Sequence, residues 1–136
     1  MENIIIRDAT IEDFEKVKKL DDILSFEHQQ MRSDIIKKEL LHLSKEIYSN
    51  IISSHNKVCF VAEYNKKIIA YCYAKKCFYH GHSTIKDMSV IELEKIYVIE
   101  KYRHTNIATK LFHKIVEFAK ICNVDQIELS VWGWNT

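Results

Sequence analysis

The sequence predicts an α/β or α+β layered domain, in which helices pack on a mixed β-sheet. Apolar residues recur at helical spacing in three segments and alternate, as strands require, in the others. A tight hairpin joins two of the predicted strands, and a strand–helix–strand crossover follows it. The length of 136 residues, 47% of them hydrophobic, suits a single domain that spans residues 1–136.

The first part of the chain is predicted to contain a strand and two helices. Residues 3–7 form a β-branched run typical of a strand. Thr10 stands three residues before Asp13, a near capping box that opens a helix. The apolar residues of this helix share one face: Phe14, Val17, Leu20 and Leu24. Ser33 can cap a second helix, whose apolar residues keep the same spacing: Ile36, Leu40, Leu43, Ile47 and Ile51.

The remainder is predicted to contain four strands and one helix. The segments 58–63 and 68–74 are typical of strands, and Asn65 between them can take the positive φ of a tight hairpin. The more polar stretch 78–89 is predicted to be a loop. The last elements are a strand at 91–98, an amphipathic helix at 106–122 and a strand at 125–131.

Charge and composition exclude several classes of protein. Twenty Lys and Arg against nineteen Asp and Glu leave a formal charge of +1, which argues against nucleic-acid and anionic-membrane partners. No apolar run approaches the roughly 18–20 residues of a membrane span, and the N-terminus lacks the features of a signal peptide. We therefore expect a cytoplasmic protein with no nucleic acid and no membrane as partners.

Cysteine and histidine spacing predicts no metal site. No C-x-x-C pair or zinc-ligand spacing is present, so the thiols are expected to be reduced and mostly structural: Cys59, Cys72, Cys77 and Cys122. His80 and His82 lack a third ligand nearby, which favours a plain loop.

The segment with the clearest chemical meaning is the turn that leads from the strand at 91–98 into the helix at 106–122. The first N–H groups of a helix have no intrahelical partners, and the helix dipole adds partial positive charge there. Such a helix start can bind an anion, and Arg103 and Thr105 could add donors to a phosphate. Any helix N-terminus offers these amides and this dipole, so the feature alone is a weak indication of a phosphate site.

The residue types of this segment resemble the acetyl-CoA-binding motif of the GNAT superfamily of N-acetyltransferases, a strand followed by Arg/Gln-x-x-Gly-x-Gly/Ala. The motif takes the form Arg103-His104-Thr105-Asn106-Ile107-Ala108, after Glu92-Leu93-Glu94-Lys95-Ile96-Tyr97-Val98. The resemblance extends to residues 5–10, 60–63, 68–71 and 127–131. It implies a GNAT-like mixed, mostly antiparallel sheet with helices on both faces, lacking the last strands.

The resemblance implies an acetyl-CoA-dependent N-acetyltransferase, in which a neutral amine attacks the acetyl group directly. Acetyl-CoA would be a co-substrate, with no metal. Main-chain N–H groups from Arg103 to Ala108 would hold the diphosphate, and a strand would pair with the pantetheine arm. The residues implied in cofactor binding are Ile96, Tyr97, Val98, Arg103, His104, Thr105, Asn106, Ile107, Ala108 and Asn135.

The same resemblance implies a general base that takes the proton of the amine. Glu92 matches the strand-borne glutamate of the family, and Glu94 lies on the same face by the period of two. A solvated role for both carboxylates is the plain alternative. Some members of the family carry the base at the position of Ser130, which cannot fill that role unaided.

Two departures from the family pattern bear on function. Asn106 replaces the glycine of the motif. Asn tolerates positive φ, but its side chain narrows the approach of the phosphate, so we expect weaker rather than abolished binding of coenzyme A. The family continues past the position of Asn135 with a helix and two strands, which include a tyrosine that protonates the leaving thiolate. We therefore expect that the chain is truncated or completes its sheet edge through a partner, as in a homodimer.

These departures keep a second function open. It is a catalytically weak or inactive GNAT-like domain with a CoA-sensing, regulatory or protein-interaction role. The amine acceptor of the first function is not identified by any part of the sequence.

Overall fold

The computed structural model describes residues 3–31, 43–79, 88–124 and 126–132. These residues form a five-stranded sheet with the order β1-β2-β3-β4-β5. The pairs β1–β2, β2–β3 and β3–β4 are antiparallel, and β4–β5 is parallel. The strands are β1 (Ile5–Asp8), β2 (Lys57–Tyr64), β3 (Lys67–Tyr79), β4 (Met88–Val98) and β5 (Ile127–Trp132). The predicted mixed, mostly antiparallel sheet is confirmed.

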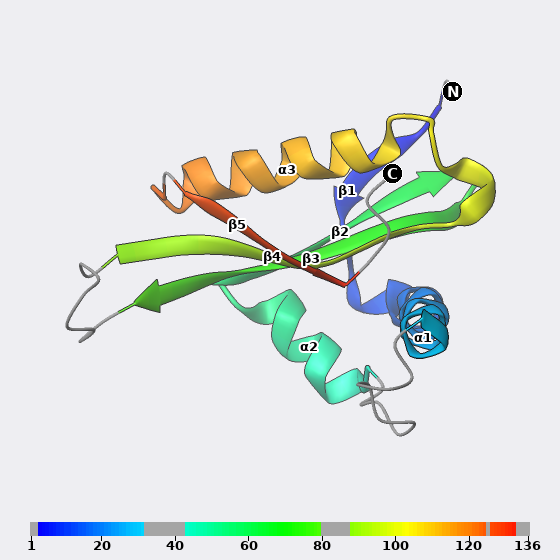
Figure 1. Cartoon of the computed structure of the whole chain (residues 1–136), viewed down its shortest axis with the longest axis horizontal. Helices are drawn as coiled ribbons and strands as arrows, with labels where there is room; N and C mark the ends of the chain where they lie inside the picture. Colours follow the sequence, from blue (N-terminus) through cyan, green and yellow to red (C-terminus); the bar gives the residue numbers. More distant parts are fainter. Residues whose placement is uncertain (1–2, 32–42, 80–87, 125, 133–136) are drawn as a thin grey trace.

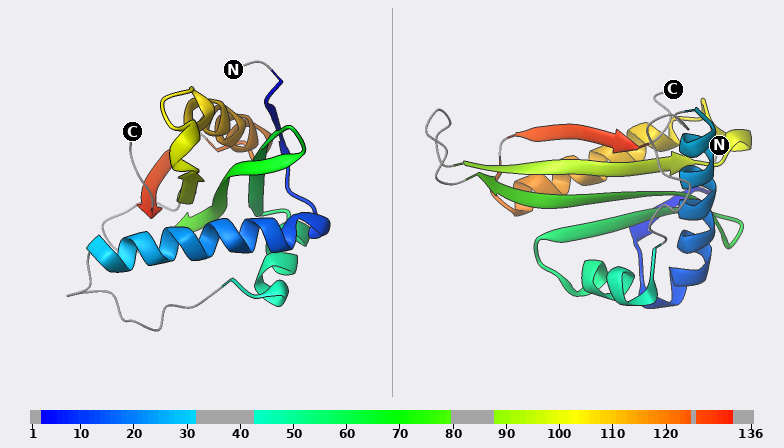
Figure 2. Two further views of the ribbon diagram at one scale, coloured as in Figure 1. Left: turned by 90° about the vertical axis from the view of Figure 1, so that its right-hand side faces the viewer. Right: turned by 60° about the horizontal axis from the view of Figure 1, so that its bottom comes forward.

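Helices cover both faces of the sheet, as predicted. They are α1 (Phe14–Met31), α2 (Lys45–Ser53) and α3 (Ile107–Ile121). α3 lies on one face, and α1 and α2 lie on the other (Figure 1). Figure 2 shows α1 crossing the strands near the end of the sheet where β4 leads into α3. This crossing brings residues of α1 close to the C-terminal end of β4.

α1 and α3 bury apolar stripes, as predicted, whereas in α2 the predicted Ile47 is exposed and Tyr48 and Ile51 are buried. On one face, α3 packs its buried residues against the sheet: Ile107, Leu111, Ile115 and Ala119. On the other face, α1 contributes Phe14, Val17, Leu20 and Leu24 to a cluster that includes Val61 and Tyr71. Since burial of a large aliphatic side chain contributes roughly 1.5–3 kcal/mol, these two stripes supply much of the stability of the layers.

A charged network fixes the start of α1. The Thr10 N–H donates to Asp13 at 2.8 Å, in a short 3₁₀ turn (η1, Ile11–Asp13) that precedes the helix. Arg7 contacts Asp13 at 2.8 Å and Glu63 at 2.8 Å. The hydrogen bond from Arg7 lowers the pKa of Asp13 to about 2. The predicted helix start at Thr10 is confirmed, and the same carboxylate ties it to β1 and β2.

The second helix differs from its prediction. The backbone of Ser44 is extended, and its side chain accepts a hydrogen bond from the Ile47 N–H at 3.1 Å, so α2 begins at Lys45. The predicted helix from Ser33 to Ile51 is therefore not continuous through Ser44. Ser33 itself lies outside the described residues. The apolar spacing continues across the break, which is why periodicity alone missed it.

The predicted loop at 78–89 is wrong at both of its ends. β3 continues to Tyr79 and β4 begins at Met88, and these two residues are paired. The arms of this hairpin extend beyond the helices (Figure 1). Phe78 there is 61% exposed, so the strand needs no apolar pattern in this part. Residues 80–87, which include His80 and His82, lie outside the described residues.

The turn between β2 and β3 is built as predicted. Asn65 and Lys66 have φ angles of 49° and 64°. Two successive residues with positive φ are typical of the hairpin turn that matches the twist of its strands.

Candidate functional site

A bulge interrupts β4 at the position of the candidate carboxylates. Tyr73 of β3 pairs with Lys95, and the next residue of β3, Ala74, pairs with Leu93. Glu94 is thus the extra residue in β4. The pairing of β4 with β5 is also irregular between Leu93 and Lys95. A bulge of this kind bends a strand and re-aims its side chains, which makes it a common feature of functional sites.

Beyond the bulge, β4 has an edge that β5 does not cover. The last pair between the two strands is Lys95 with Trp132, and no described residue of β5 pairs with the segment 96–98. On its other side this segment remains paired with β3, through Ile96–Cys72, Tyr97–Tyr71 and Val98–Ala70.

The alternation of an antiparallel ladder decides which groups face this open edge. The Ile99 N–H donates to the Ile69 carbonyl oxygen at 3.0 Å. Residues two apart direct their backbone groups to the same side, so Tyr97 also points to β3. Ile96 and Val98 then direct their N–H and C=O groups away from β3. The last parallel pair with Trp132 takes the Ile96 N–H, so the Ile96 C=O and the groups of Val98 lie at the open edge. Of the three residues predicted to pair with pantetheine, these two offer their backbone.

The turn that follows has the backbone conformation the motif requires. A 3₁₀ turn (η2, Glu100–Tyr102) leads to His104 and Asn106, with φ angles of 69° and 66°. Asn106 is the N-cap of α3, and its φ and ψ lie in the left-handed region. This position favours glycine sterically, and Asn is among the residues that tolerate it best. The predicted positive φ at Asn106 is confirmed.

The N-terminus of α3 leaves amides available. The first intrahelical bond is from the Lys110 N–H to the Asn106 carbonyl oxygen, at 3.0 Å. The N–H groups of Ile107, Ala108 and Thr109 therefore precede the helical ladder. Within the described chain, Asn106 makes no side-chain capping bond to them. An anion at this corner would meet donors and the positive end of the helix dipole.

Two side chains of the turn do not face outward as donors. The Arg103 Nε donates to the Val98 carbonyl oxygen at 2.8 Å, and the Thr105 hydroxyl donates to the Tyr102 carbonyl oxygen. The main-chain N–H of Arg103 donates to the Glu100 carbonyl oxygen at 3.2 Å. These contacts engage the Arg103 Nε and the Thr105 hydroxyl with nearby carbonyls, and a phosphate contact from either side chain stays a prediction.

The two candidate carboxylates lie on one face of the sheet, as their spacing predicts. Glu92 accepts a hydrogen bond from the Cys77 thiol at 3.2 Å, and Glu94 forms an ion pair with Lys75 at 2.8 Å. Cys77 and Lys75 are two residues apart on β3 and share a face. Tyr73, on that same face, packs against the α1 and α2 cluster. Both carboxylates are therefore on the side of α1 and α2.

These contacts differ in electrostatic character. Burial, together with the hydrogen bond to Glu92, raises the pKa of Cys77 to about 11. Glu92 thus has a neutral donor beside it, and within the described chain it forms no salt bridge. Glu94 is compensated by the Lys75 ammonium. Burial and the charge of Glu94 raise the pKa of Tyr73 to about 12.

Sequence reasoning missed Asp21, a buried carboxylate of α1. It is 1% exposed and accepts hydrogen bonds from the Tyr71 hydroxyl at 2.6 Å and from Lys95 Nζ at 2.9 Å. It thereby joins α1 to the residue that follows the bulge. An available signal was its place between Leu20 and Leu24, on the apolar stripe, where an acidic residue needs a partner.

Other predicted positions and sites can be placed only in part. Asn135 and the side chain of Ser130 lie outside the described residues. The described part of the chain holds no group of three or more His, Cys, Asp or Glu residues arranged for a metal ion. None of its helices is long and apolar enough to cross a membrane.

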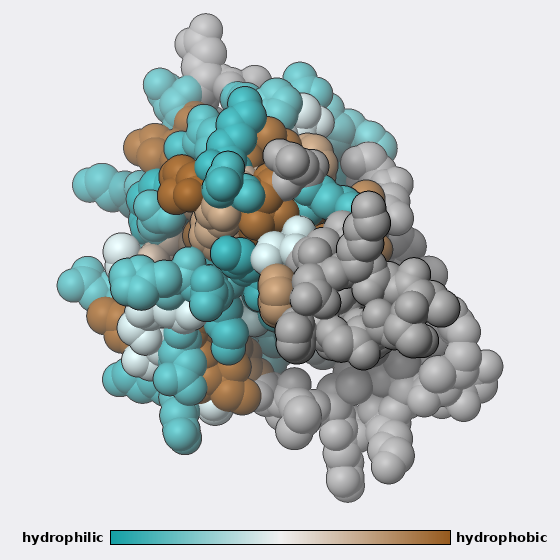
Figure 3. Space-filling view, turned by 90° about the vertical axis from the view of Figure 1, so that its left-hand side faces the viewer, coloured by the Kyte–Doolittle hydropathy of each residue, from teal (hydrophilic) through white to brown (hydrophobic). Residues whose placement is uncertain are grey.

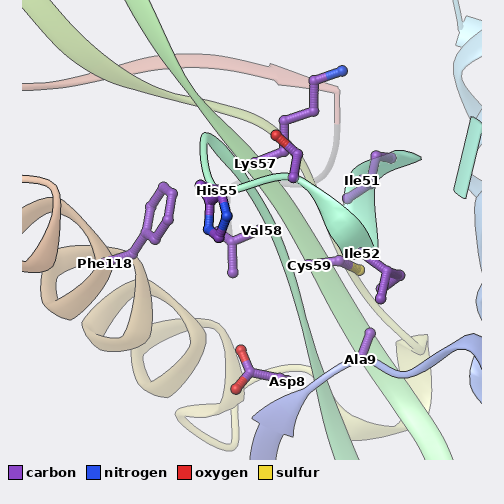
Figure 4. Close-up of a pocket in the computed structure, with 10 residues that line it drawn as sticks. Asp8, Ala9, Ile51, Ile52, His55, Lys57, Val58, Cys59 and Phe118 are labelled. Carbon is purple, nitrogen blue, oxygen red and sulfur yellow. The ribbon is translucent and has the colours of Figure 1, made fainter. Parts of the chain in front are cut away.

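A cavity of about 260 Å³ lies elsewhere, between the end of α2, the start of β2 and α3. Its lining includes Asp8, His55, Lys57 and Phe118 (Figure 4). None of the predicted site residues lines it, so it is separate from the site built around β4.

Comparisons with known proteins agree with the fold described above. A structure of a mutant BH1408 protein from Bacillus halodurans is 25% identical, with a TM-score of 0.81; the match covers 92% of this chain and 81% of that one. An acetyltransferase from Vibrio fischeri is 22% identical, with a TM-score of 0.76 and coverage of 94% and 96%. The aminoglycoside 6'-N-acetyltransferase AAC(6')-Ih from Acinetobacter baumannii is 16% identical, with a TM-score of 0.70 and coverage of 93% and 78%.

The sequence was also compared with curated proteins and with protein families. No curated protein matches it. The profile of the acetyltransferase (GNAT) family matches residues 17–136, which include most of α1, the β4 bulge and the start of α3. The match covers most of the chain, and the resemblance noted in the motif is confirmed. The chain belongs to the acetyltransferase (GNAT) family.

Proposed function

We propose that this protein is an acetyl-CoA-dependent N-acetyltransferase that transfers an acetyl group to an amine by direct attack. The observation that carries the proposal is the continuity of two binding elements. The open edge of β4 at Ile96 and Val98 leads, through one short turn, to the free amides of α3. The pantetheine arm pairs with the first element as an added strand, and the diphosphate binds the second.

The diphosphate site includes fewer main-chain amides than the motif suggests. Because the Arg103 N–H is bonded to Glu100, we assign the diphosphate to the amides from His104 to Ala108. The side chains of His104 and Asn106 are exposed at this corner. We infer that the Asn106 side chain restricts the approach of the ligand without blocking it.

The chemical step that fits these residues is attack of the amine nitrogen on the thioester carbonyl carbon. The N–C bond forms, the C–S bond breaks, and coenzyme A leaves as a thiolate that takes up a proton. A main-chain N–H of β4 beyond the bulge would donate to the carbonyl oxygen as negative charge develops. No acyl-enzyme intermediate is needed.

We assign the general base to Glu92 rather than Glu94. A carboxylate held in an ion pair has to turn away from its cation before it can contact an amine. Glu94 has Lys75 at 2.8 Å, whereas Glu92 has the neutral Cys77 thiol at 3.2 Å. Glu92 takes the amine proton directly or through a water molecule. The amine approaches from the side of α1 and α2, on which both carboxylates lie.

Ligand-dependent thermal stability, followed by turnover, tests this proposal. Acetyl-CoA in millimolar excess should raise the Tm in a saturable manner, since a ligand at 100 times its Kd stabilises by about 2.7 kcal/mol. A panel of primary amines should then release coenzyme A thiol, measured with a chromogenic disulfide. Absence of both the Tm shift and thiol release contradicts the assignment.

The second candidate is a GNAT-like domain with a CoA-sensing, regulatory or protein-interaction role. The exposed side chain of Asn106 at the diphosphate corner favours it. A Tm shift with acetyl-CoA but no thiol release across the amine panel supports CoA sensing. No shift at all supports the interaction role.

The edge of the sheet remains a candidate contact for a second copy of the chain. β5 is the edge strand of the described sheet, and Leu129 on it is 65% exposed. Apolar side chains interrupt the polar surface at this end of the molecule, where α3 ends in Ile121 (Figure 3). We propose a homodimer through this edge. Light scattering that gives the monomer mass at micromolar concentration contradicts it. The cytoplasmic location likewise stays a prediction.

A further inference from the structure

The side chain of Arg103 is folded into the protein, although Arg103 lies in the turn before α3. It is only 13% exposed. Its Nε donates to the Val98 carbonyl oxygen at 2.8 Å, and its guanidinium lies over the Tyr97 ring, 5.2 Å from the ring centre. The guanidinium therefore packs on the last two residues of β4.

The contact with Val98 affects the open edge directly. The Val98 carbonyl is one of the groups that point away from β3, towards the place proposed for pantetheine. Since Arg103 occupies this oxygen, an added strand finds the Ile96 carbonyl and the Val98 N–H, and pairing ends there. Arg103 thus sets where the ligand-binding edge of β4 stops.

A second contact joins the same guanidinium to α1. Its Nη2 lies 3.7 Å from Glu27 Oε2, and Glu27 Oε1 accepts a hydrogen bond from the Tyr97 hydroxyl at 3.4 Å. The Glu27 side chain is 27% exposed and Tyr97 is 5% exposed. Partial burial reduces the screening of these charges. α1, the end of β4 and the turn before α3 are therefore held together by one cationic side chain.

We propose that Arg103 is a positioning residue: it orders the pantetheine edge of β4 and its junction with α1, and it does not contact the diphosphate. The inference rests on the proposed function, because it assigns the open edge to the pantetheine arm. It differs from what the motif suggests for an arginine beside an anion site. A contact with the diphosphate would need this side chain to leave Val98 and Glu27.

Two ligands separate positioning from phosphate contact. S-acetyl-pantetheine retains the thioester and the pantetheine arm but lacks the diphosphate and the nucleotide. The variant Arg103→Met keeps the length of the side chain and removes its donors. We expect it to raise the Kd of both acetyl-CoA and S-acetyl-pantetheine by the same factor, about tenfold, the size of one lost charge-assisted hydrogen bond.

The matched control is Lys101→Met, which removes a cation two residues away. Lys101 lies over the Tyr102 ring at 5.6 Å and is exposed. It is expected to leave the Kd of S-acetyl-pantetheine unchanged. If Arg103→Met weakens acetyl-CoA alone, Arg103 acts on the diphosphate and the inference is wrong, while the proposed function stands. If the unaltered protein binds neither ligand, both are wrong.

A measurement without ligand tests the junction with α1. The Tm is determined for Arg103→Met, Glu27→Gln and the double variant. Coupling predicts that the double variant loses less than the sum of the two single losses, because each single change already breaks the same contact. Strictly additive losses overturn the part of the proposal that concerns α1.

Discussion

The Cys77 thiol of β3 donates a hydrogen bond to Glu92 of β4, with Sγ and Oε2 3.2 Å apart. Register places the two residues diagonally on neighbouring strands, since Cys77 pairs with Val90 and Glu92 pairs with Lys75. The thiol is half-buried. Each group therefore reports on the charge of the other, and the pair offers a test of the site that needs no substrate.

Glu92→Gln should make Cys77 react faster with iodoacetamide. The carboxylate raises the pKa of Cys77 above its usual value, although burial is the larger cause, so its removal increases the thiolate fraction at pH 8. We expect a several-fold increase in the rate, measured by mass spectrometry in a Cys122→Ser background. Glu94→Gln is the matched control and should have a smaller effect. An unchanged rate in Glu92→Gln means that the contact is absent in solution.

The same substitution should abolish most turnover. General-base catalysis contributes about 10²–10⁴-fold, so kcat/KM of Glu92→Gln should fall by that order. Glu94→Gln, which loses an ion pair with Lys75, should fall less than about tenfold. A larger loss in Glu94→Gln would exchange the roles of the two carboxylates.

Asn106→Gly should strengthen the binding of acetyl-CoA, whereas Asn106→Ala should lower the stability of the fold. The φ of 66° at Asn106 is sterically free for glycine, whereas alanine there loses about 1–2 kcal/mol of stability. Asn106→Gly should bind acetyl-CoA more tightly, because no side chain narrows the diphosphate corner. Calorimetric titration and chemical denaturation measure the two effects. Weaker binding by Asn106→Gly would mean that the carboxamide contacts the ligand.

Acid should weaken the start of α1 through Asp13. Arg7 lowers the pKa of this carboxyl from 3.8 to about 2, so ionisation of Asp13 stabilises the folded protein. The stabilisation is full above pH 3.8 and is lost as the pH falls through 2. It amounts to about 2 kcal/mol. The difference in unfolding free energy between the unaltered protein and Asp13→Asn should therefore shrink from pH 5 to pH 2, by urea denaturation. A constant difference contradicts the pairing.

Lys95→Met should destabilise more than its partly exposed side chain suggests. It leaves Asp21, which is 1% exposed, with the Tyr71 hydroxyl but without its cation. Loss of one partner of a buried ion pair costs about 3 kcal/mol. The double variant Asp21→Asn with Lys95→Met should recover part of this loss, because no buried charge remains. Lys18→Met, which breaks an exposed pair with Asp22, is the control and should change stability little.

Several features of the fold are local, and the sequence alone predicted them. The apolar spacing of 106–122 identified α3, since a helix that packs on a sheet needs one apolar stripe. Asn65 and Asn106 marked two of the positive-φ positions, because few other residues accept that backbone. The motif around Arg103 identified the family before any contact was known.

Other features depend on how distant segments meet. The bulge at Glu94 exists only as a mismatch between β4 and its neighbours, and no single strand encodes it. The break before α2 follows from the extended backbone of Ser44, which the continuing apolar spacing concealed. The reach of β3 and β4 past residue 78 comes from their mutual pairing rather than from burial.

The amino-acid order by itself determined the layers, the left-handed corner at Asn106 and the candidate carboxylates. The inward orientation of the Arg103 side chain depends on the tertiary structure, in which α1 crosses the end of β4. That crossing sets Glu27 beside the guanidinium and Asp21 beside Lys95. The physical reason is range: a backbone preference acts within a few residues, whereas a charge pairs with whatever the packed chain brings near it.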